Sequence, residues 1–149
     1  MPFAASGAAR LGVGGRLVAG LVAAACLAVL VVAASITPAP EGHGSHSQLG
    51  LPPCGWAVVL DRPCPTCGMT TAYAHAVRGQ FPGAFRAQPF GLLLALGTGA
   101  AFWAGLYISA TRSQLGRVFG RMVTGKVLWC IAALAAAAWA WKWATWTGF

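Results

Sequence analysis

Three long stretches without a charged side chain constrain this chain more than any other feature of its sequence. They cover residues 17–36, 89–111 and 127–141, and the third extends to residue 146 if Lys142 directs its amine toward the membrane surface. At a rise of about 1.5 Å per residue, a helix of about twenty residues crosses a hydrocarbon layer of roughly 30 Å. Only 8% of the residues are charged, whereas soluble domains average about 25%. We therefore expect an all-α membrane protein with three transmembrane helices, the third over residues 127–146.

Aromatic residues gather at the end of the third stretch. The tryptophans concerned are Trp139, Trp141, Trp143 and Trp146. Membrane helices carry such belts at the interface between lipid and water. The pattern predicts that this end of the helix lies among lipid headgroups and that the lipid bilayer is the main partner of the chain.

Small residues recur at four-residue spacing in the second stretch, at Gly97, Ala101 and Gly105. Such residues let helix backbones approach closely in lipid, where no hydrophobic force drives association. Similar spacing in the two alanine-rich stretches is explained equally well by their composition. We expect these three residues to form a helix-packing face, and self-association or another membrane protein as a further partner.

Basic residues predict the orientation of the helices. Arg10 and Arg16 precede the first helix, and the short connection 112–126 carries four more, whereas the longer connection 37–88 carries three. The positive-inside rule places residues 1–16 and the short connection in the cytoplasm, and the long connection outside. The net charge of +8 therefore reflects membrane topology, and we expect no nucleic-acid partner.

The first stretch also resembles a signal peptide. Basic residues precede it, and Ala33, Ala34 and Ser35 provide small side chains for cleavage. Its apolar part is longer than a usual signal-peptide core, which favours a retained anchor over a cleaved segment.

A short helix is predicted over residues 68–78 in the outward segment, with Gly79 as its C-terminal cap. Its apolar face consists of Met69, Ala72, Tyr73, Ala76 and Val77. Its polar face consists of Thr71, His75 and Arg78. We expect this helix to lie at the outer membrane interface.

Three cysteines lie in the same outward segment, where the compartment is oxidising. Cys64 and Cys67 form a Cys-Pro-Thr-Cys motif, and Cys54 lies ten positions before Cys64. One interpretation is a zinc site, because zinc often takes three thiolates and one imidazole. His43 or His46 in the preceding flexible linker would supply the imidazole.

His75 does not fit that zinc site. It follows Cys67 by eight positions, which is about 12 Å along a helix, whereas ligands of one ion lie roughly 3–4 Å apart.

Two further interpretations of the cysteines need no zinc. A structural disulfide from Cys54 to Cys64 or Cys67 would close a loop of about 10 to 15 residues and stabilise the fold by roughly 3 kcal/mol. It would leave one cysteine unexplained. Alternatively, Cys64 and Cys67 form a thiol–disulfide or metal-handling pair, since a helix that begins after them lowers a thiol pKa.

Catalytic groups of other kinds are scarce. Glu41 and Asp61 are the only acidic residues, which leaves little for acid–base catalysis by carboxylates. We therefore expect no enzyme, but a small integral membrane protein whose three-cysteine site is structural and serves as an interaction module.

The cysteine segment is similar to a known family. Residues 51–94 contain a cysteine, the pattern Cys-Pro-x-Cys-Gly-x-Thr, a short helix ended by glycine, and a proline that opens a transmembrane helix. The matching residues are Cys54, Cys64, Pro65, Cys67, Gly68, Thr70, Gly79, Ala84 and Pro89. This resembles domain of unknown function 2752, a group of small prokaryotic membrane proteins. The resemblance implies a membrane topology but no activity. Together with the distribution of basic residues, it leads us to expect a multi-pass protein of the bacterial inner membrane with its N-terminus inside.

The chain departs from the family pattern at two positions. Thr71 stands where the family usually has arginine, and Gln88 stands where it usually has asparagine. An arginine one turn after Cys67 would help to hold a thiolate, so its absence weakens the redox interpretation for this chain.

Overall fold

Three long helices frame the molecule. The computed structural model describes residues 12–111, 113 and 124–146, and it contains α1 (Val13–Ser35), α5 (Pro89–Thr111) and α7 (Gly125–Ala144). All three are long and apolar enough to cross a membrane, and no strand occurs in the described residues. The expected all-α membrane fold with three such helices is confirmed. Most of the cytoplasmic segments expected at 1–16 and 112–126 lies outside the described residues.

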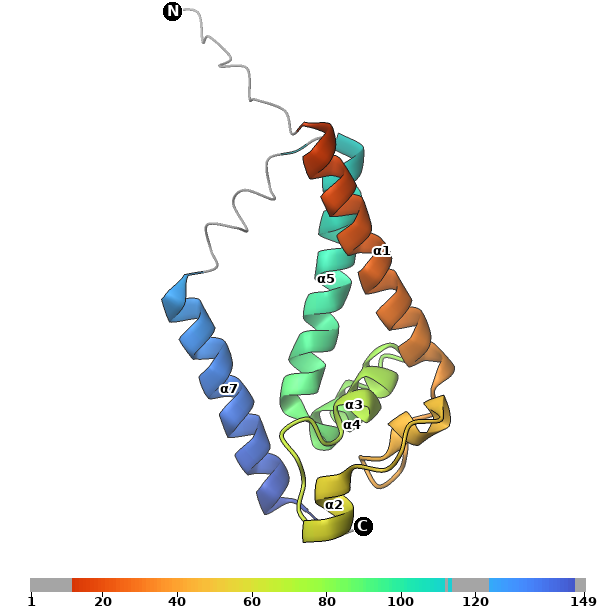
Figure 1. Ribbon diagram of the computed structural model, residues 1–149, viewed down its shortest axis with the longest axis vertical. Coiled ribbons are helices and arrows are strands. Elements are labelled where there is room, and N and C mark those ends of the chain that lie inside the picture. Colours follow the sequence, from red (N-terminus) through yellow and green to blue (C-terminus); the bar gives the residue numbers. More distant parts are fainter. Residues whose placement is uncertain (1–11, 112, 114–123, 147–149) are drawn as a thin grey trace, which may run out of the picture.

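The helices α1 and α5 contact each other where α1 begins and α5 ends, and they diverge toward the cap (Figure 1). Gly105 permits the close approach: a Cβ there would lie 2.8 Å from the carbonyl oxygen of Ala19 and 3.1 Å from the Cβ of Ala23. At the end of α1 away from the cysteines, the Arg16 Nε donates a hydrogen bond to the carbonyl oxygen of Ser109 at 2.9 Å. The pair is thus held by backbone proximity in its middle and a polar contact near its end.

The other two residues of the expected packing face differ from Gly105. Ala101 is half-buried, whereas Gly97 is exposed and a Cβ there would meet nothing within 4 Å. In this single chain the close helix contact is therefore made at Gly105.

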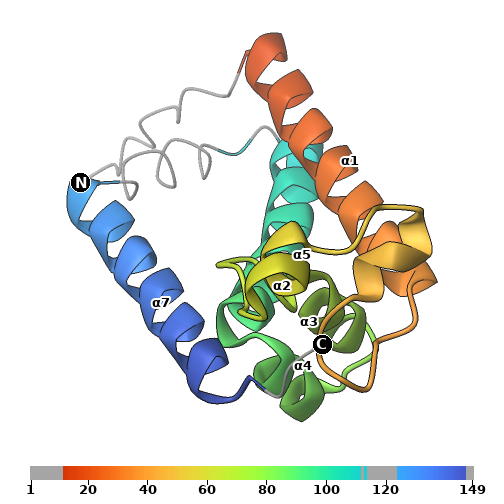
Figure 2. The same ribbon diagram turned by 60° about the horizontal axis from the view of Figure 1, so that its bottom comes forward.

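Residues 36–88 form a compact cap between α1 and α5. The cap contains η1 (Ser45–Leu49), α2 (Gly55–Leu60), α3 (Met69–Ala76) and α4 (Phe81–Ala87). Its core is made of small side chains, with Ala72, Ala84 and Ala87 buried against one another. Small residues allow the short helices to pack closely at the end of α5, where they form one unit (Figure 2).

The expected helix after the Cys-Pro-Thr-Cys motif is α3, but its surroundings are more enclosed than its sequence pattern suggests. Thr71, on the face expected to be polar, is fully buried, as is Ala74. The Arg78 guanidinium donates hydrogen bonds to the carbonyl oxygens of Ala74 at 2.7 Å and Ala34 at 2.8 Å, so it joins α3 to the last turn of α1. The helix packs against protein on most of its circumference because α1, α4 and α5 all contact it.

Gly68, directly before α3, is where three segments of the cap meet. Its φ is +85°, and a Cβ would lie 2.6 Å from the carbonyl oxygen of Ala87 and 2.7 Å from that of Gly42. Only glycine combines this backbone conformation with so close an approach. The linker, the cysteine loop and the end of α4 are therefore locked together at one backbone position.

Helix α7 diverges from α5 over most of its length and reaches the cap with its C-terminal end (Figure 1). There the Trp139 indole N–H donates a hydrogen bond to the Pro63 carbonyl oxygen at 3.0 Å. The Arg62 guanidinium lies 5.1 Å from the centre of the Trp143 ring. Some of the tryptophans expected to form a lipid-facing belt thus attach α7 to the cap.

Lys142 also differs from its expected position. Its amine does not extend to the surface, because the side chain is only 4% exposed and the Nζ donates to the Gly42 carbonyl oxygen at 3.3 Å. The cap lies within reach of this lysine, so the amine is directed into protein.

Candidate functional site

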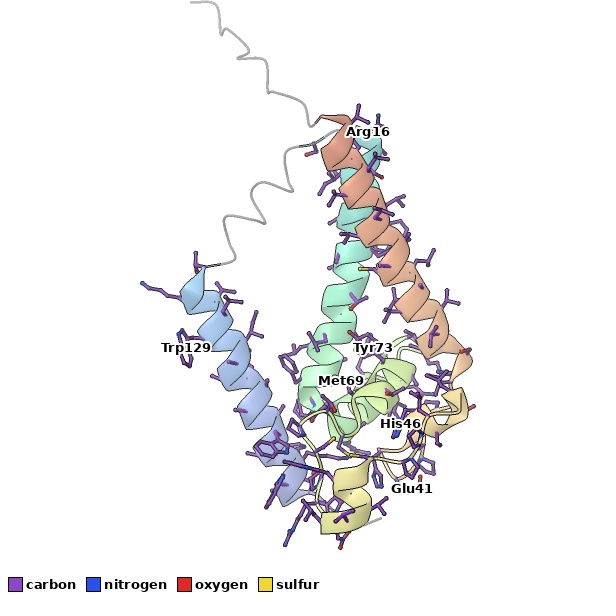
Figure 3. All side chains as sticks on the ribbon, viewed as in Figure 1. Arg16, Glu41, His46, Met69, Tyr73 and Trp129 are labelled. Atoms are coloured by element: carbon purple, nitrogen blue, oxygen red, sulfur yellow. The ribbon has the colours of Figure 1, made fainter. Side chains whose placement is uncertain are left out.

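The three outward cysteines, Cys54, Cys64 and Cys67, line one cleft in the cap with a volume of about 350 Å³. In Figure 3, the labelled Met69 and His46, which also line it, mark this part of the cap. Three segments that are separate in the sequence therefore converge: the linker, the start of α2 and the cysteine loop.

Local backbone structure places each thiol. Cys54 is the residue directly before α2, with an extended backbone (φ −62°, ψ 116°). Cys64 and Cys67 are the ends of a turn, because the Cys67 N–H donates to the Cys64 carbonyl oxygen at 3.0 Å. The Cys64 thiol also forms a 3.4 Å hydrogen bond with the Thr66 hydroxyl. The turn thus places both motif cysteines on the lining of the cleft that Cys54 also lines.

The surroundings of Cys54 favour its thiolate form. Hydrogen bonds from the backbone N–H of Ala57, from the Cys64 thiol and from the backbone N–H of Trp56 lower the pKa of Cys54, against an opposing effect of burial. These N–H groups belong to the first turn of α2, where they have no partner within the helix. Cys54 is half-exposed, so its thiol is both accessible and disposed to ionise.

The pKa of Cys67 is shifted in the opposite direction from that of Cys54. Burial, assisted by the nearby Cys64 and Cys54 thiols, raises the pKa of Cys67 to about 11, although Lys142 acts in the other direction. The start of α3 after the motif suggested a lowered thiol pKa, but desolvation dominates at this position. The sequence pattern pointed to the Cys64 and Cys67 pair, whereas the thiol pKa that the structure lowers belongs to Cys54, at the start of a helix that the sequence did not reveal.

The two candidate histidines lie in different surroundings. His46 lines the cysteine cleft, and its Nε2 forms a 3.1 Å hydrogen bond with the Pro52 carbonyl oxygen. His43 is buried beside the Trp146 ring at 4.6 Å between centroids, and its Nδ1 pairs with the Glu41 carbonyl oxygen at 3.0 Å. Burial lowers the pKa of His43, which keeps the imidazole neutral.

The side chains do not converge as a zinc site requires. Within the described ranges, no group of three or more His, Cys, Asp or Glu side chains is arranged to hold a metal ion. All five cysteines are free thiols in the structure, and Cys26 and Cys130 lie on α1 and α7, outside the cleft. The thiols are thus close enough to influence one another without the geometry of a preformed metal centre.

Two residues that support the site had no obvious role in the sequence. Fully buried Thr71 shares a 2.8 Å hydrogen bond with the Ser45 hydroxyl, which ties α3 to the linker. Gln88 is 1% exposed, and its Nε2 donates to the Pro65 carbonyl oxygen of the motif at 3.3 Å. Both are positions that the sequence analysis had singled out, without assigning them a structural role.

Comparison with known proteins shows that the segment containing this site is similar to one family. Residues 54–102 match the family model described as "Protein of unknown function (DUF2752)". The matched segment contains the three cysteines of the cleft, α2, α3, α4 and the first part of α5, so the resemblance inferred from the motif is confirmed there. Comparisons with curated proteins and with solved structures gave no match.

Proposed function

We propose that this protein is a small multi-pass protein of the bacterial inner membrane whose outward cap is a structural interaction module, closed by a disulfide between Cys54 and Cys64. It is not an enzyme. The observation that carries the proposal is that these two thiols, which come from separate segments of the cap, line one cleft and lie close enough for Cys64 to lower the pKa of Cys54. An oxidising compartment would convert such a pair into a disulfide.

The arrangement of the helix ends supports this topology. The start of α1 and the end of α5 lie together at the end of the molecule opposite the cap (Figure 1). A chain with its N-terminus inside would place both of these ends at the cytoplasmic face and the cap at the outer face, in agreement with the distribution of basic residues.

The proposed disulfide accounts for the cysteine that the sequence left unexplained. Cys67 is 7% exposed and its raised pKa keeps the thiol protonated and unreactive. It behaves as a small buried side chain beneath the pair. The disulfide would close the loop that contains α2 and stabilise the cap by roughly 3 kcal/mol.

The test is the thiol content and stability of protein purified without reductant. Mass measured before and after alkylation under denaturing conditions should show Cys54 and Cys64 protected and Cys67 modified. Cys54→Ser and Cys64→Ser should each lower the unfolding free energy by about 3 kcal/mol, and the double variant should be no worse. Three alkylated cap cysteines, or a Cys54→Ser protein as stable as the parent, would refute the proposal. Elemental analysis of the same sample tests for zinc.

A second candidate function is thiol–disulfide exchange with a partner protein. It is favoured by the lowered pKa of half-exposed Cys54. The Cys54 thiolate would attack a disulfide of the partner and release one partner thiolate, and Cys64 would then displace the second, so that two electrons pass to the partner. In that case a Cys64→Ser protein would accumulate as a mixed disulfide through Cys54, whereas a purely structural pair would not.

A further inference from the structure

A second cavity of the cap, separate from the cysteine cleft, lies where α4, the linker and the end of α7 meet. Its volume is about 500 Å³, and Glu41, His75, Arg86, Trp141 and Lys142 are among its lining residues. None of these residues lines the cysteine cleft. The cavity combines polar groups of the cap with an aromatic residue at the end of a membrane-spanning helix.

Lys142 is unusual among the residues that line this cavity, because it is a basic residue with a buried side chain. Its side chain is 4% exposed, and the Gly42 carbonyl oxygen at 3.3 Å is its one hydrogen-bond acceptor in the described structure. An ammonium has three donors. No carboxylate of the described residues lies within 4.0 Å of the amine. A buried cation without a counter-ion is destabilising, so an anion that entered this cavity would stabilise the amine.

A second cation lines the same cavity. Arg86, on the last turn of α4, is exposed, and a guanidinium presents donors suited to phosphate oxygens. The formal charges of the acidic and basic side chains that line the cavity, Arg86, Lys142 and Glu41, sum to +1. The Nδ1 of His75 pairs with the Gln80 amide oxygen at 2.7 Å, so the neutral ring presents an accepting nitrogen to the cavity, and His75 is not among the proposed contacts to an anion.

The location of the cavity restricts the kind of anion. Trp141 and Lys142 lie in the last turn of α7, where the helix leaves the hydrocarbon layer and lipid headgroups begin. A ligand here would present its phosphate to the cap while any acyl chains remain in the bilayer.

We propose that this cavity binds the phosphate group of an anionic lipid headgroup, with Lys142 and Arg86 as its cationic contacts. The ligand supplies the counter-ion that the buried amine lacks and joins α7 to the cap. The shared chemistry is a phosphate anion, which a lipid or a small soluble phosphate compound would both offer.

The experiment uses the full chain, purified in detergent and stripped of anionic lipid. Dioleoylphosphatidylglycerol and dioleoylphosphatidylcholine are titrated separately and retention is followed by native mass spectrometry. Inorganic phosphate is titrated in parallel and followed by thermal unfolding. The variants are Lys142→Met, Arg86→Gln and, as a matched control, Lys126→Met, which removes an exposed lysine from the opposite end of the same helix.

The parent and Lys126→Met are expected to retain phosphatidylglycerol in preference to phosphatidylcholine. Lys142→Met should weaken that binding about tenfold to a hundredfold, and Arg86→Gln about tenfold, as for hydrogen bonds to charged groups. Stabilisation by inorganic phosphate with the same dependence on the variants would support the site and identify a soluble phosphate compound as its ligand. Binding that is equal in parent, Lys142→Met and Arg86→Gln, or no response to either probe, would overturn the proposal. Because Arg86 is exposed, its variant remains informative if Lys142→Met fails to fold.

Discussion

Helices α1 and α7 have similar lengths and apolar character but are held in place by different means. α1 lies against α5 through a close backbone approach at Gly105, within the part of the molecule that would be in lipid. α7 diverges from α5 away from the cap and is attached near its C-terminal end, through Trp139 and Lys142, to backbone carbonyl groups of the cap. The position of α1 therefore depends on small side chains along a helix, whereas that of α7 depends on whether the cap is folded.

The largest effect is expected from Gly68→Ala, which should disrupt the cap and with it the attachment of α7. A left-handed backbone disfavours alanine, and its Cβ would also lie 2.6 Å from the Ala87 carbonyl oxygen. We expect a loss of about 3–5 kcal/mol in unfolding free energy in detergent. Gly79→Ala is the matched control, since its φ is +72° but nothing lies within 4 Å, and it should lose about 1–2 kcal/mol. Equal losses in the two variants would contradict the meeting of segments at Gly68.

Gly105→Val tests the close contact that holds α1 against α5. The added side chain would meet the backbone of Ala19 and force α1 away from α5, with an expected loss of about 3 kcal/mol. Gly97→Val, on the same helix, has open space and should change stability by less than about 0.5 kcal/mol. Thermal unfolding in detergent measures both, and a larger loss at Gly97 would show that α1 packs elsewhere.

Alkaline pH should loosen the cap while leaving the α1–α5 contact intact. The pKa of Cys67 is raised from 9.0 to about 11 in the folded protein. The folded state therefore holds this proton more tightly than the unfolded state does. That stabilising contribution is complete below pH 9 and is lost as the pH rises through about 11.

The expected fall in stability between these two pH values is roughly 2 kcal/mol. Unfolding of the reduced protein should show this slope in the parent and in Cys130→Ala, which removes an exposed thiol from α7. Cys67→Ala should abolish the slope. A slope that persists in Cys67→Ala would assign it to another group.

The smallest effect is expected from Trp139→Phe. This change removes the hydrogen bond to the Pro63 carbonyl oxygen and should lower stability by about 1 kcal/mol. Trp129→Phe provides the control, because Trp129 is 79% exposed near the opposite end of α7 (Figure 3). If the two variants behave alike, α7 is not attached to the cap through Trp139.

The sequence predicted the long helices well because uninterrupted apolar stretches have few alternatives in a chain of this composition. The short cap elements were harder to predict. The burial of Thr71 depends on a hydroxyl partner, Ser45, that is distant in the sequence. The helical turn that makes Cys54 acidic is only six residues long, and its apolar residues gave no periodic signal. The sequence predicted that the Lys142 amine extends to the membrane surface, as is usual for a lysine near a helix end. Its buried position could not be predicted because it depends on Gly42, which is distant in the sequence.

The attachment of α7 has a consequence for the order of biosynthesis. The carbonyl groups of Gly42 and Pro63 belong to segments made early, but the side chains that bind them belong to the last long helix of the described chain. The cap would therefore remain incomplete while the first two helices are already in the membrane, and it would close only when α7 has been inserted. Resistance of the cap to protease would then report that synthesis and insertion of the whole chain are finished.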